Sequence, residues 1–143
     1  MKSTILALTL SATPALACDS LQIHVTSYHT DRDLILDVNE KNPGLGCRVD
    51  NYIGSAFDWE FGGYLNSYGR PTLYNLFDLT NDAGFGVYAG LASGYSEIHT
   101  MEIGTVIAGL VYQGDYFTLR ATPSYSARTD TWGAVVGVSL TIK

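Results

Sequence analysis

The sequence predicts an all-β fold, and more specifically a closed antiparallel up-and-down membrane β-barrel of about eight strands. Three observations support this prediction. Apolar residues alternate with small or polar residues in several segments, which is the period of a β-strand with two different faces. No apolar run after residue 17 is long enough for a transmembrane helix. Charged residues make up only 15% of the chain, where about a quarter is usual in soluble domains.

The first 17 residues have the pattern of a cleaved export signal rather than of a folded element. Lys2 provides the positive start, a short apolar run follows, and Ala15 and Ala17 frame a signal-peptidase site. The apolar run is too short to cross a bilayer. We therefore expect a signal peptide over 1–17 and a single barrel domain over 18–143.

Export to an oxidising compartment favours a disulfide bond between Cys18 and Cys47, which are the two cysteines of the chain. The alternative is that Cys18 becomes lipidated after cleavage, although Pro14 and Ala15 stand where lipoprotein signals usually carry a larger aliphatic residue. Two cysteines without CxxC spacing do not indicate a metal site, and we expect no cofactor.

The strands expected after the signal peptide are separated by clusters of glycine, proline, asparagine, aspartate and serine, which are typical of turns. In chain order they lie near 20–29, 44–51, 56–66, 72–80, 84–95, 100–112, 116–126 and 131–142. The alternation is clearest in the last of them, where Trp132, Ala134, Val136, Val138, Leu140 and Ile142 share one face. In the same way, Phe57, Trp59 and Phe61 alternate with Asp58, Glu60 and Gly62.

Which face points outward follows from composition. The second face of 84–95 is nearly all glycine and alanine, which suits the lumen of a narrow barrel better than a water-exposed surface. The charged residues Asp58, Glu60, Glu102 and Arg120 would then lie in the lumen or at a rim. Buried charges need partners, so we expect Arg120 to pair with Asp58 or Glu60 in a salt-bridge network, with a catalytic carboxylate dyad as the alternative. His24 is expected to form hydrogen bonds in the lumen.

A candidate site lies at the outer rim. If the N-terminus is periplasmic, the first and third strands end on the same side and bring together His29, Asn66 and Ser67. We interpret His29 as a general base, Ser67 as a hydroxyl that binds or activates an ester, and Asn66 as a polar orienting group. The alternative is ordinary loop chemistry, because Asn-Ser-x-Gly is a turn sequence. Further candidates near this rim are Glu97 and His99, and, as contacts for lipid phosphates, Arg70 and Arg128.

Taken in order, several of these segments resemble a known family. They are His29, Asn39-Glu40, Pro43-Gly44 with Gly46, and Asn66-Ser67 followed by Arg70-Pro71. This order is similar to that of the outer-membrane lipid A palmitoyltransferases (PagP), and the same segments resemble small uncharacterised phage and bacterial barrels. The resemblance implies an eight-stranded barrel that moves a palmitoyl chain from phospholipid to lipid A with rim His, Asp and Ser residues. The chain departs from that pattern at Asn66, where the family has aspartate, and in lacking an N-terminal amphipathic helix.

These observations lead to a functional hypothesis with two alternatives. The hypothesis is a monomeric PagP-like acyltransferase in the outer membrane of a Gram-negative bacterium, with lipopolysaccharide and phospholipid as its partners. The alternatives are a non-enzymatic outer-membrane barrel, for surface adhesion or phage-encoded exclusion, and a soluble periplasmic barrel that binds an apolar ligand. The net charge of −6 and the absence of a basic patch exclude a nucleic-acid partner.

Overall fold

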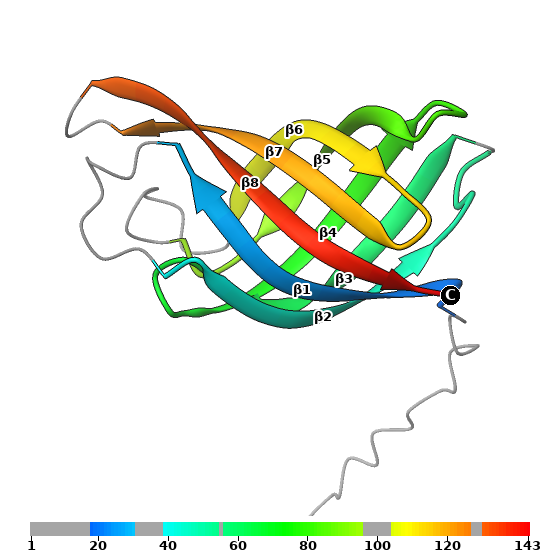
Figure 1. Ribbon diagram of the computed structural model, residues 1–143, viewed down its shortest axis with the longest axis horizontal. Helices are drawn as coiled ribbons and strands as arrows, with labels where there is room; N and C mark the ends of the chain where they lie inside the picture. Colours follow the sequence, from blue (N-terminus) through cyan, green and yellow to red (C-terminus); the bar gives the residue numbers. More distant parts are fainter. Residues whose placement is uncertain (1–17, 31–38, 55, 96–103, 127–129) are drawn as a thin grey trace, which may run out of the picture.

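The structure is a computed structural model that describes residues 18–30, 39–54, 56–95, 104–126 and 130–143. The expected signal peptide over 1–17 lies outside the described residues. In sequence order the strands are β1 (Ser20–His29), β2 (Lys41–Val49), β3 (Phe57–Leu65), β4 (Pro71–Thr80), β5 (Phe85–Ala92), β6 (Thr105–Gln113), β7 (Phe117–Ser126) and β8 (Thr131–Ile142). They form a closed barrel in which each strand pairs with the next and β8 pairs back with β1 (Figure 1).

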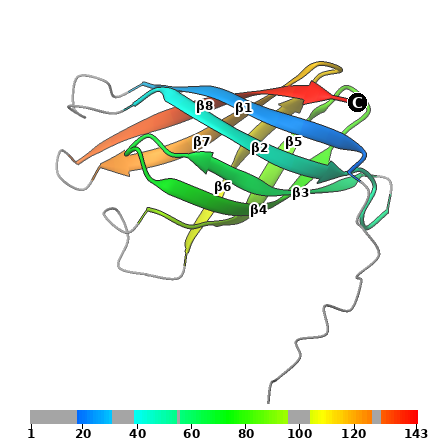
Figure 2. The ribbon, with the colours of Figure 1, turned by 90° about the horizontal axis from the view of Figure 1, so that it is seen from below.

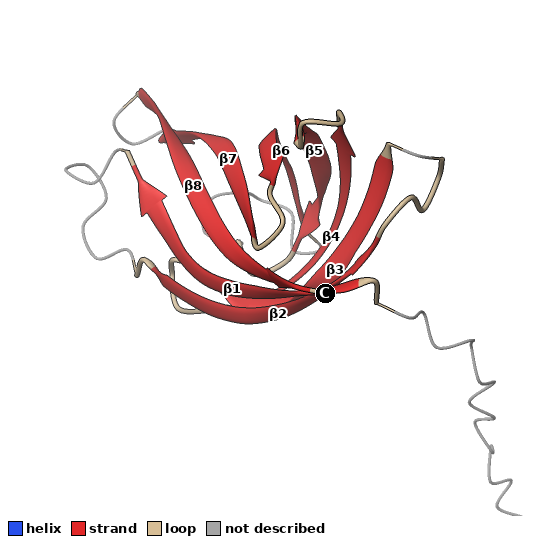
Figure 3. Cartoon of the chain, turned by 45° about the vertical axis from the view of Figure 1, so that its right-hand side comes forward, coloured by secondary structure: helices blue, strands red, loops and turns tan. Residues whose placement is uncertain are grey.

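All the strand pairs are antiparallel, so the connections alternate between the two ends of the barrel. Figure 2 shows the C-terminus at one end, which we call the terminal end, with the β2–β3 connection beside it. The connections after β1, β3, β5 and β7 lie at the other end, which we call the loop end, and they include the two longest ones. The described part of the chain consists of strands and loops (Figure 3) and holds no helix that is long and apolar enough to cross a membrane.

The predicted barrel of eight antiparallel strands is confirmed, and so is the predicted disulfide bond between Cys18 and Cys47. The bond ties Cys18, two residues before β1, to the terminal half of β2, and it uses the thiol that lipidation would need. Strands β1 and β8 begin and end at the predicted residues. The sixth strand was expected to begin near residue 100, and β6 begins at Thr105. Residues 100–103 of the expected strand lie outside the described residues.

The second strand differs from its prediction, which placed Pro43-Gly44 at the border between loop and strand. β2 already begins at Lys41, so both residues lie within it. A proline is tolerated there because the β1–β2 register shifts between His24 and Thr26, and Pro43 is paired with neither neighbouring strand. The missing N–H of proline therefore costs no ladder hydrogen bond.

The exterior of the barrel carries large apolar side chains, as the alternation predicts. Leu73, Val106 and Leu110 have exposed fractions of 72%, 74% and 65%. Aromatic side chains gather near the ends of the wall. At the terminal end, rings contact one another in the groups Tyr52–Trp59–Phe61 and Phe85–Tyr112–Phe117, and at the loop end Tyr125 contacts Trp132.

Among the described residues, the seam between β6 and β7 is hydrogen-bonded only in its terminal half. The described pairing runs from Gln113↔Thr118 to Leu110↔Ala121 and stops there. Beyond that point, β6 stays paired with β5 down to Thr105, and β7 stays paired with β8 up to Ser126. Pro123, which has no N–H to donate, lies in the part of β7 that faces this seam. The two strands therefore part in the loop half of the wall.

Candidate functional site at the loop end

His29 and Ser67 meet inside the loop end of the barrel. His29 is the last residue of β1, and Ser67 follows β3 in the Asn66–Gly69 turn. The Nε2 atom of His29 lies 2.8 Å from the Oγ atom of Ser67. Both residues are buried, with exposed fractions of 5% and 7%. This is the hydrogen-bond distance that a base and a nucleophile require.

Two further residues join this pair, and neither was predicted as a site residue from the sequence. Ser27 lies two residues before His29 and so faces the same side of β1. Its Oγ atom lies 3.3 Å from the Oγ atom of Ser67 and donates a hydrogen bond of 2.5 Å to the Oδ1 atom of Asn42. The amide of Asn42 donates to the carbonyl oxygen of Leu65, which fixes its orientation. We call His29, Ser27, Asn42 and Ser67 the rim cluster.

Asn66 is adjacent to the rim cluster, but its side chain holds the turn. Its Oδ1 atom accepts hydrogen bonds from the backbone N–H groups of Tyr68 and Arg70, and its Nδ2 atom donates to the carbonyl oxygen of Gly94. Gly69 completes the turn with a positive φ of 71°, which only glycine adopts without strain. Asn66 therefore positions Ser67 through the backbone.

An ionic cluster crosses the middle of the lumen, as the alternation of charges predicted. Arg120 contacts Glu60 at 2.8 Å and Asp78 at 2.6 Å, and Arg48 contacts the same carboxylates at 3.0 Å and 3.8 Å. Of the two predicted partners of Arg120, Glu60 is thus confirmed. Asp58 is not its partner in these contacts, because it lies beside the β2–β3 turn and accepts a hydrogen bond from the N–H of Asn51. Arg48 and Asp78 were not foreseen, and Glu102 lies outside the described residues.

In the Gly44-Leu45-Gly46 segment, the two glycines make room for Tyr64 and Tyr74. A Cβ atom at residue 44 would lie 2.3 Å from the Cβ atom of Tyr64. Gly46 pairs with Gly62, and both face the lumen opposite Tyr74. A Cβ atom at residue 46 would lie 1.9 Å from the hydroxyl oxygen of Tyr74. That hydroxyl donates to Glu60 and lies 2.6 Å from the Nε2 atom of His24. Because the single Tyr74 proton goes to Glu60, His24 must donate from Nε2, and its Nδ1 atom accepts from Ser139 at 2.8 Å. His24 is thus the lumen hydrogen-bonding residue that we expected.

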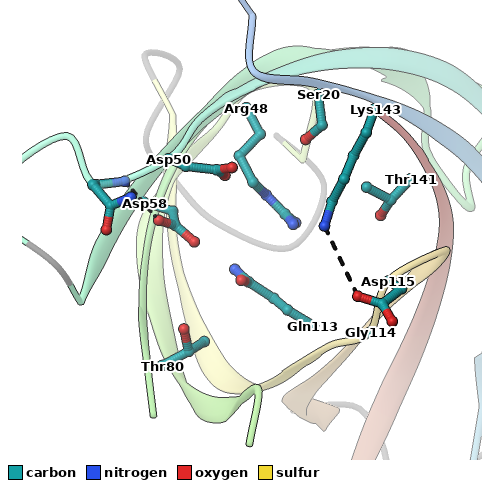
Figure 4. A pocket seen from close by; sticks show the side chains of 11 residues that line it. Ser20, Arg48, Asp50, Asp58, Thr80, Gln113, Gly114, Asp115, Thr141 and Lys143 are labelled. Atoms are coloured by element: carbon teal, nitrogen blue, oxygen red, sulfur yellow. Dashed lines mark hydrogen bonds and ion pairs between the residues drawn. The ribbon is translucent and has the colours of Figure 1, made fainter. Parts of the chain in front are cut away.

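A polar mouth opens at the terminal end and encloses about 260 Å³ (Figure 4). Arg48 reaches into it from the ionic cluster, and Asp50 and Asp58 line the wall on one side. On the other side, Lys143 contacts Asp115 at 3.9 Å. Partial burial and the neighbouring Asp58 carboxylate raise the pKa of Asp50, and Arg48 opposes this shift.

Four other residues were predicted near the rim cluster. Glu97, His99 and Arg128 lie outside the described residues, whereas Arg70 belongs to the same turn as Ser67. The described part of the chain contains no group of histidine, cysteine, aspartate and glutamate that could hold a metal ion.

Comparisons with known proteins assign no family to this architecture. No protein-family model and no curated protein sequence matches the chain. The resemblance to the lipid A palmitoyltransferases therefore remains a prediction from the motifs alone.

Proposed function

We propose that this protein is an outer-membrane barrel that transfers acyl groups from membrane lipids at its loop end. The observation that carries the proposal is the 2.8 Å contact between His29 Nε2 and Ser67 Oγ. A serine hydroxyl is a weak nucleophile until a neighbouring base accepts its proton, and this geometry provides that base.

The chemistry is that of acyl transfer through an ester. With its own proton on Nδ1, His29 accepts the Ser67 proton at Nε2 while the Ser67 oxygen attacks the ester carbonyl of a lipid. The ester bond to the lipid alcohol then breaks, and the alcohol leaves with the proton from His29. An acceptor hydroxyl, or water, gives its proton to His29 and takes the acyl group from Ser67, which restores both residues.

The exterior supports a membrane location. Along β8, Trp132 and Leu140 are eight residues apart, which corresponds to about 27 Å of strand. At the usual tilt of a barrel strand, this gives an apolar band about 20 Å tall, close to the ~25 Å of outer-membrane barrels. Aromatic groups border the band at both ends, as expected for the two membrane interfaces. A water-soluble barrel would expose this surface at a large cost.

The parted seam between β6 and β7 supports access for lipid. It opens the wall in the loop half, at the height where we place the outer leaflet. A lipid could then present its ester to the rim cluster while its chains stay in the bilayer. Acyl transfer of this kind is compatible with the ionic cluster, which occupies the mid-lumen where the resembled family keeps an acyl pocket.

The test is mass spectrometry of lipid A and phospholipids from cells that express the wild type, His29→Ala or Ser67→Ala. We expect an acyl-sized mass change with the wild type and none with either variant. His24→Gln is the matched control, because it replaces a histidine outside the rim cluster and should keep the activity. Folding of each variant is checked by heat-modifiable migration. A full mass change with His29→Ala would refute the assigned role of that residue.

The second candidate is a non-enzymatic outer-membrane barrel that acts through its loops. It is favoured by the turn-holding role of Asn66, because an amide that cannot accept a proton stands at the position where the resembled family has aspartate. It predicts no lipid change with the folded wild-type protein in the outer membrane.

A further inference from the structure

Asn75 interrupts the apolar outer wall of the barrel. It is exposed and stands in the middle of the outward row of β4, which consists of Pro71, Leu73, Asn75, Phe77 and Leu79. On the two neighbouring strands it is paired with Phe61 and Leu91, which face the same side of the wall. Among the described residues of β3 to β8, no other outward side chain carries an amide or a charge.

One hydrogen bond fixes the direction in which the Asn75 amide faces. The Nε1–H group of Trp59 donates to the Oδ1 atom of Asn75 over 2.9 Å. Because an indole nitrogen can only donate, the amide oxygen must be turned toward Trp59 and the NH₂ group away from it. This NH₂ group donates no side-chain hydrogen bond to the described residues, and Oδ1 keeps a second lone pair. Asn75 therefore presents both a donor and an acceptor on the outer surface.

Lipid chains cannot satisfy these groups. The hydrocarbon layer holds no water, so a polar group without a partner is costly at the middle of a membrane-spanning wall. A partner that supplies one donor and one acceptor would remove this cost. A second Asn75 amide does so, because two such amides related by a twofold axis can each donate to the oxygen of the other. The chemistry of this position is thus complementary to itself.

The side chains around Asn75 allow two walls to approach closely. Gly63 and Ala89 are its diagonal neighbours on β3 and β5, since each lies two residues from the partner of Asn75 on that strand. Small residues of this kind are typical of interfaces inside membranes. Leu73 and Leu91 border the amide with exposed fractions of 72% and 56%. We call Gly63, Leu73, Asn75, Ala89 and Leu91 the amide patch.

We propose that the barrel forms a twofold dimer in the membrane through the amide patch, instead of the monomer expected from the sequence. This inference rests on the membrane location in the proposed function but not on the acyl-transfer chemistry. Each Asn75 NH₂ group donates to the Oδ1 atom of the partner's Asn75, while Trp59 keeps its own contact with Oδ1 in both copies. The leucines of the patch pack around the two amides.

The experiment is sedimentation equilibrium in density-matched detergent micelles, which measures the dissociation constant of the dimer. The main variant is Asn75→Leu, which replaces the amide by an apolar side chain of similar size. We expect a reversible dimer for the wild type and a dissociation constant about tenfold higher for the variant, because two polar contacts inside a membrane together give about that factor. Leu73→Ala in the patch should also weaken the dimer. Its matched control is Leu140→Ala on β8, which lies across the barrel from β4 and should dimerise as the wild type does.

Crosslinking in isolated outer membranes tests the same interface without detergent. A short bis-maleimide should join two copies of Leu73→Cys but not two copies of Leu140→Cys. Heat-modifiable migration checks the folding of each variant, and recovery of the barrel in the soluble periplasmic fraction would refute the proposed membrane location itself. For a folded barrel in the membrane, a monomeric wild type would overturn the dimer. It would also be overturned by an unchanged dissociation constant in Asn75→Leu, or by a crosslink from Leu73→Cys only to another protein.

Discussion

Replacing Gly46 by alanine should lower the free energy of unfolding by about 1.5–5.5 kcal/mol. The new methyl group would lie 1.9 Å from the Tyr74 hydroxyl oxygen, so the ring must move. Overpacking of this kind costs about 1–3 kcal/mol. Displacing the hydroxyl from Glu60 adds about 1.5–3 kcal/mol for a hydrogen bond to a charged group. The loss of glycine freedom in the unfolded chain returns about 0.4–1 kcal/mol.

The double-mutant cycle with Tyr74→Phe tests that explanation. Tyr74→Phe alone should cost about 1.5–3 kcal/mol, because it removes the hydrogen bond to Glu60. Once the hydroxyl is gone, the nearest atom to the new methyl group is the ring carbon Cζ, at 3.2 Å. The second substitution should then add little, and the two costs should fall short of additivity by about 2 kcal/mol.

Urea unfolding in phospholipid vesicles, followed by tryptophan fluorescence, measures these costs. Gly137→Ala is the matched control, because its methyl group would enter open space, and it should be within about 0.5 kcal/mol of the wild type or slightly more stable. Equal destabilisation by Gly46→Ala and Gly137→Ala would refute the reasoning, as would strictly additive costs in the cycle.

Three further predictions concern the disulfide, the rim turn and the mouth. Cys47→Ser should cost about 3–4 kcal/mol in the same urea assay, because the bond closes a loop with a sequence separation of 29 residues; unchanged stability would contradict this. Asn66→Ala should cost about 1–3 kcal/mol and lower acyl transfer, since it frees the turn that holds Ser67; unchanged stability and lipid profile would argue against the positioning role. Asp50 has a raised pKa in the folded state, so its contribution to stability should fall as pH rises from its unfolded pKa through its folded one. Asp50→Asn should therefore stabilise the barrel at neutral pH and not at pH values below about 3, and a larger gain in acid would contradict the sign.

The strands could be predicted because an alternating pattern has one period and the wall of a barrel has two chemically different faces. The outward row of β8 and the inward row that carries Glu60 followed directly from that parity. The same parity could not decide whether Asp58 or Glu60 pairs with Arg120. Asp58 and Glu60 share a face, and only the register places Glu60 at the height of Arg120 while leaving Asp58 at the turn.

The extent of β2 and the partners of Ser67 could not be predicted, because both depend on contacts between distant strands. Pro43-Gly44 has the composition of a turn, and it is accommodated in a strand only because the register shifts in β1. Ser27 and Asn42 have no local signal of function. They reach Ser67 because β1, β2 and the turn after β3 meet at one end of the barrel.

The depth of the lumen links the rim cluster to the parted seam. Along β1, five residues separate His29 from His24, which lies in the layer of Tyr74. Five residues span at most about 16 Å of strand, or about 12 Å of depth at a tilt near 40°. One leaflet of a bilayer needs about 15 Å for its acyl chains. A chain attached to Ser67 could therefore not extend fully into the lumen above Tyr74, and under the proposed function most of it must stay in the membrane. The β6–β7 seam is the part of the described wall where such a chain could cross without breaking ladder hydrogen bonds.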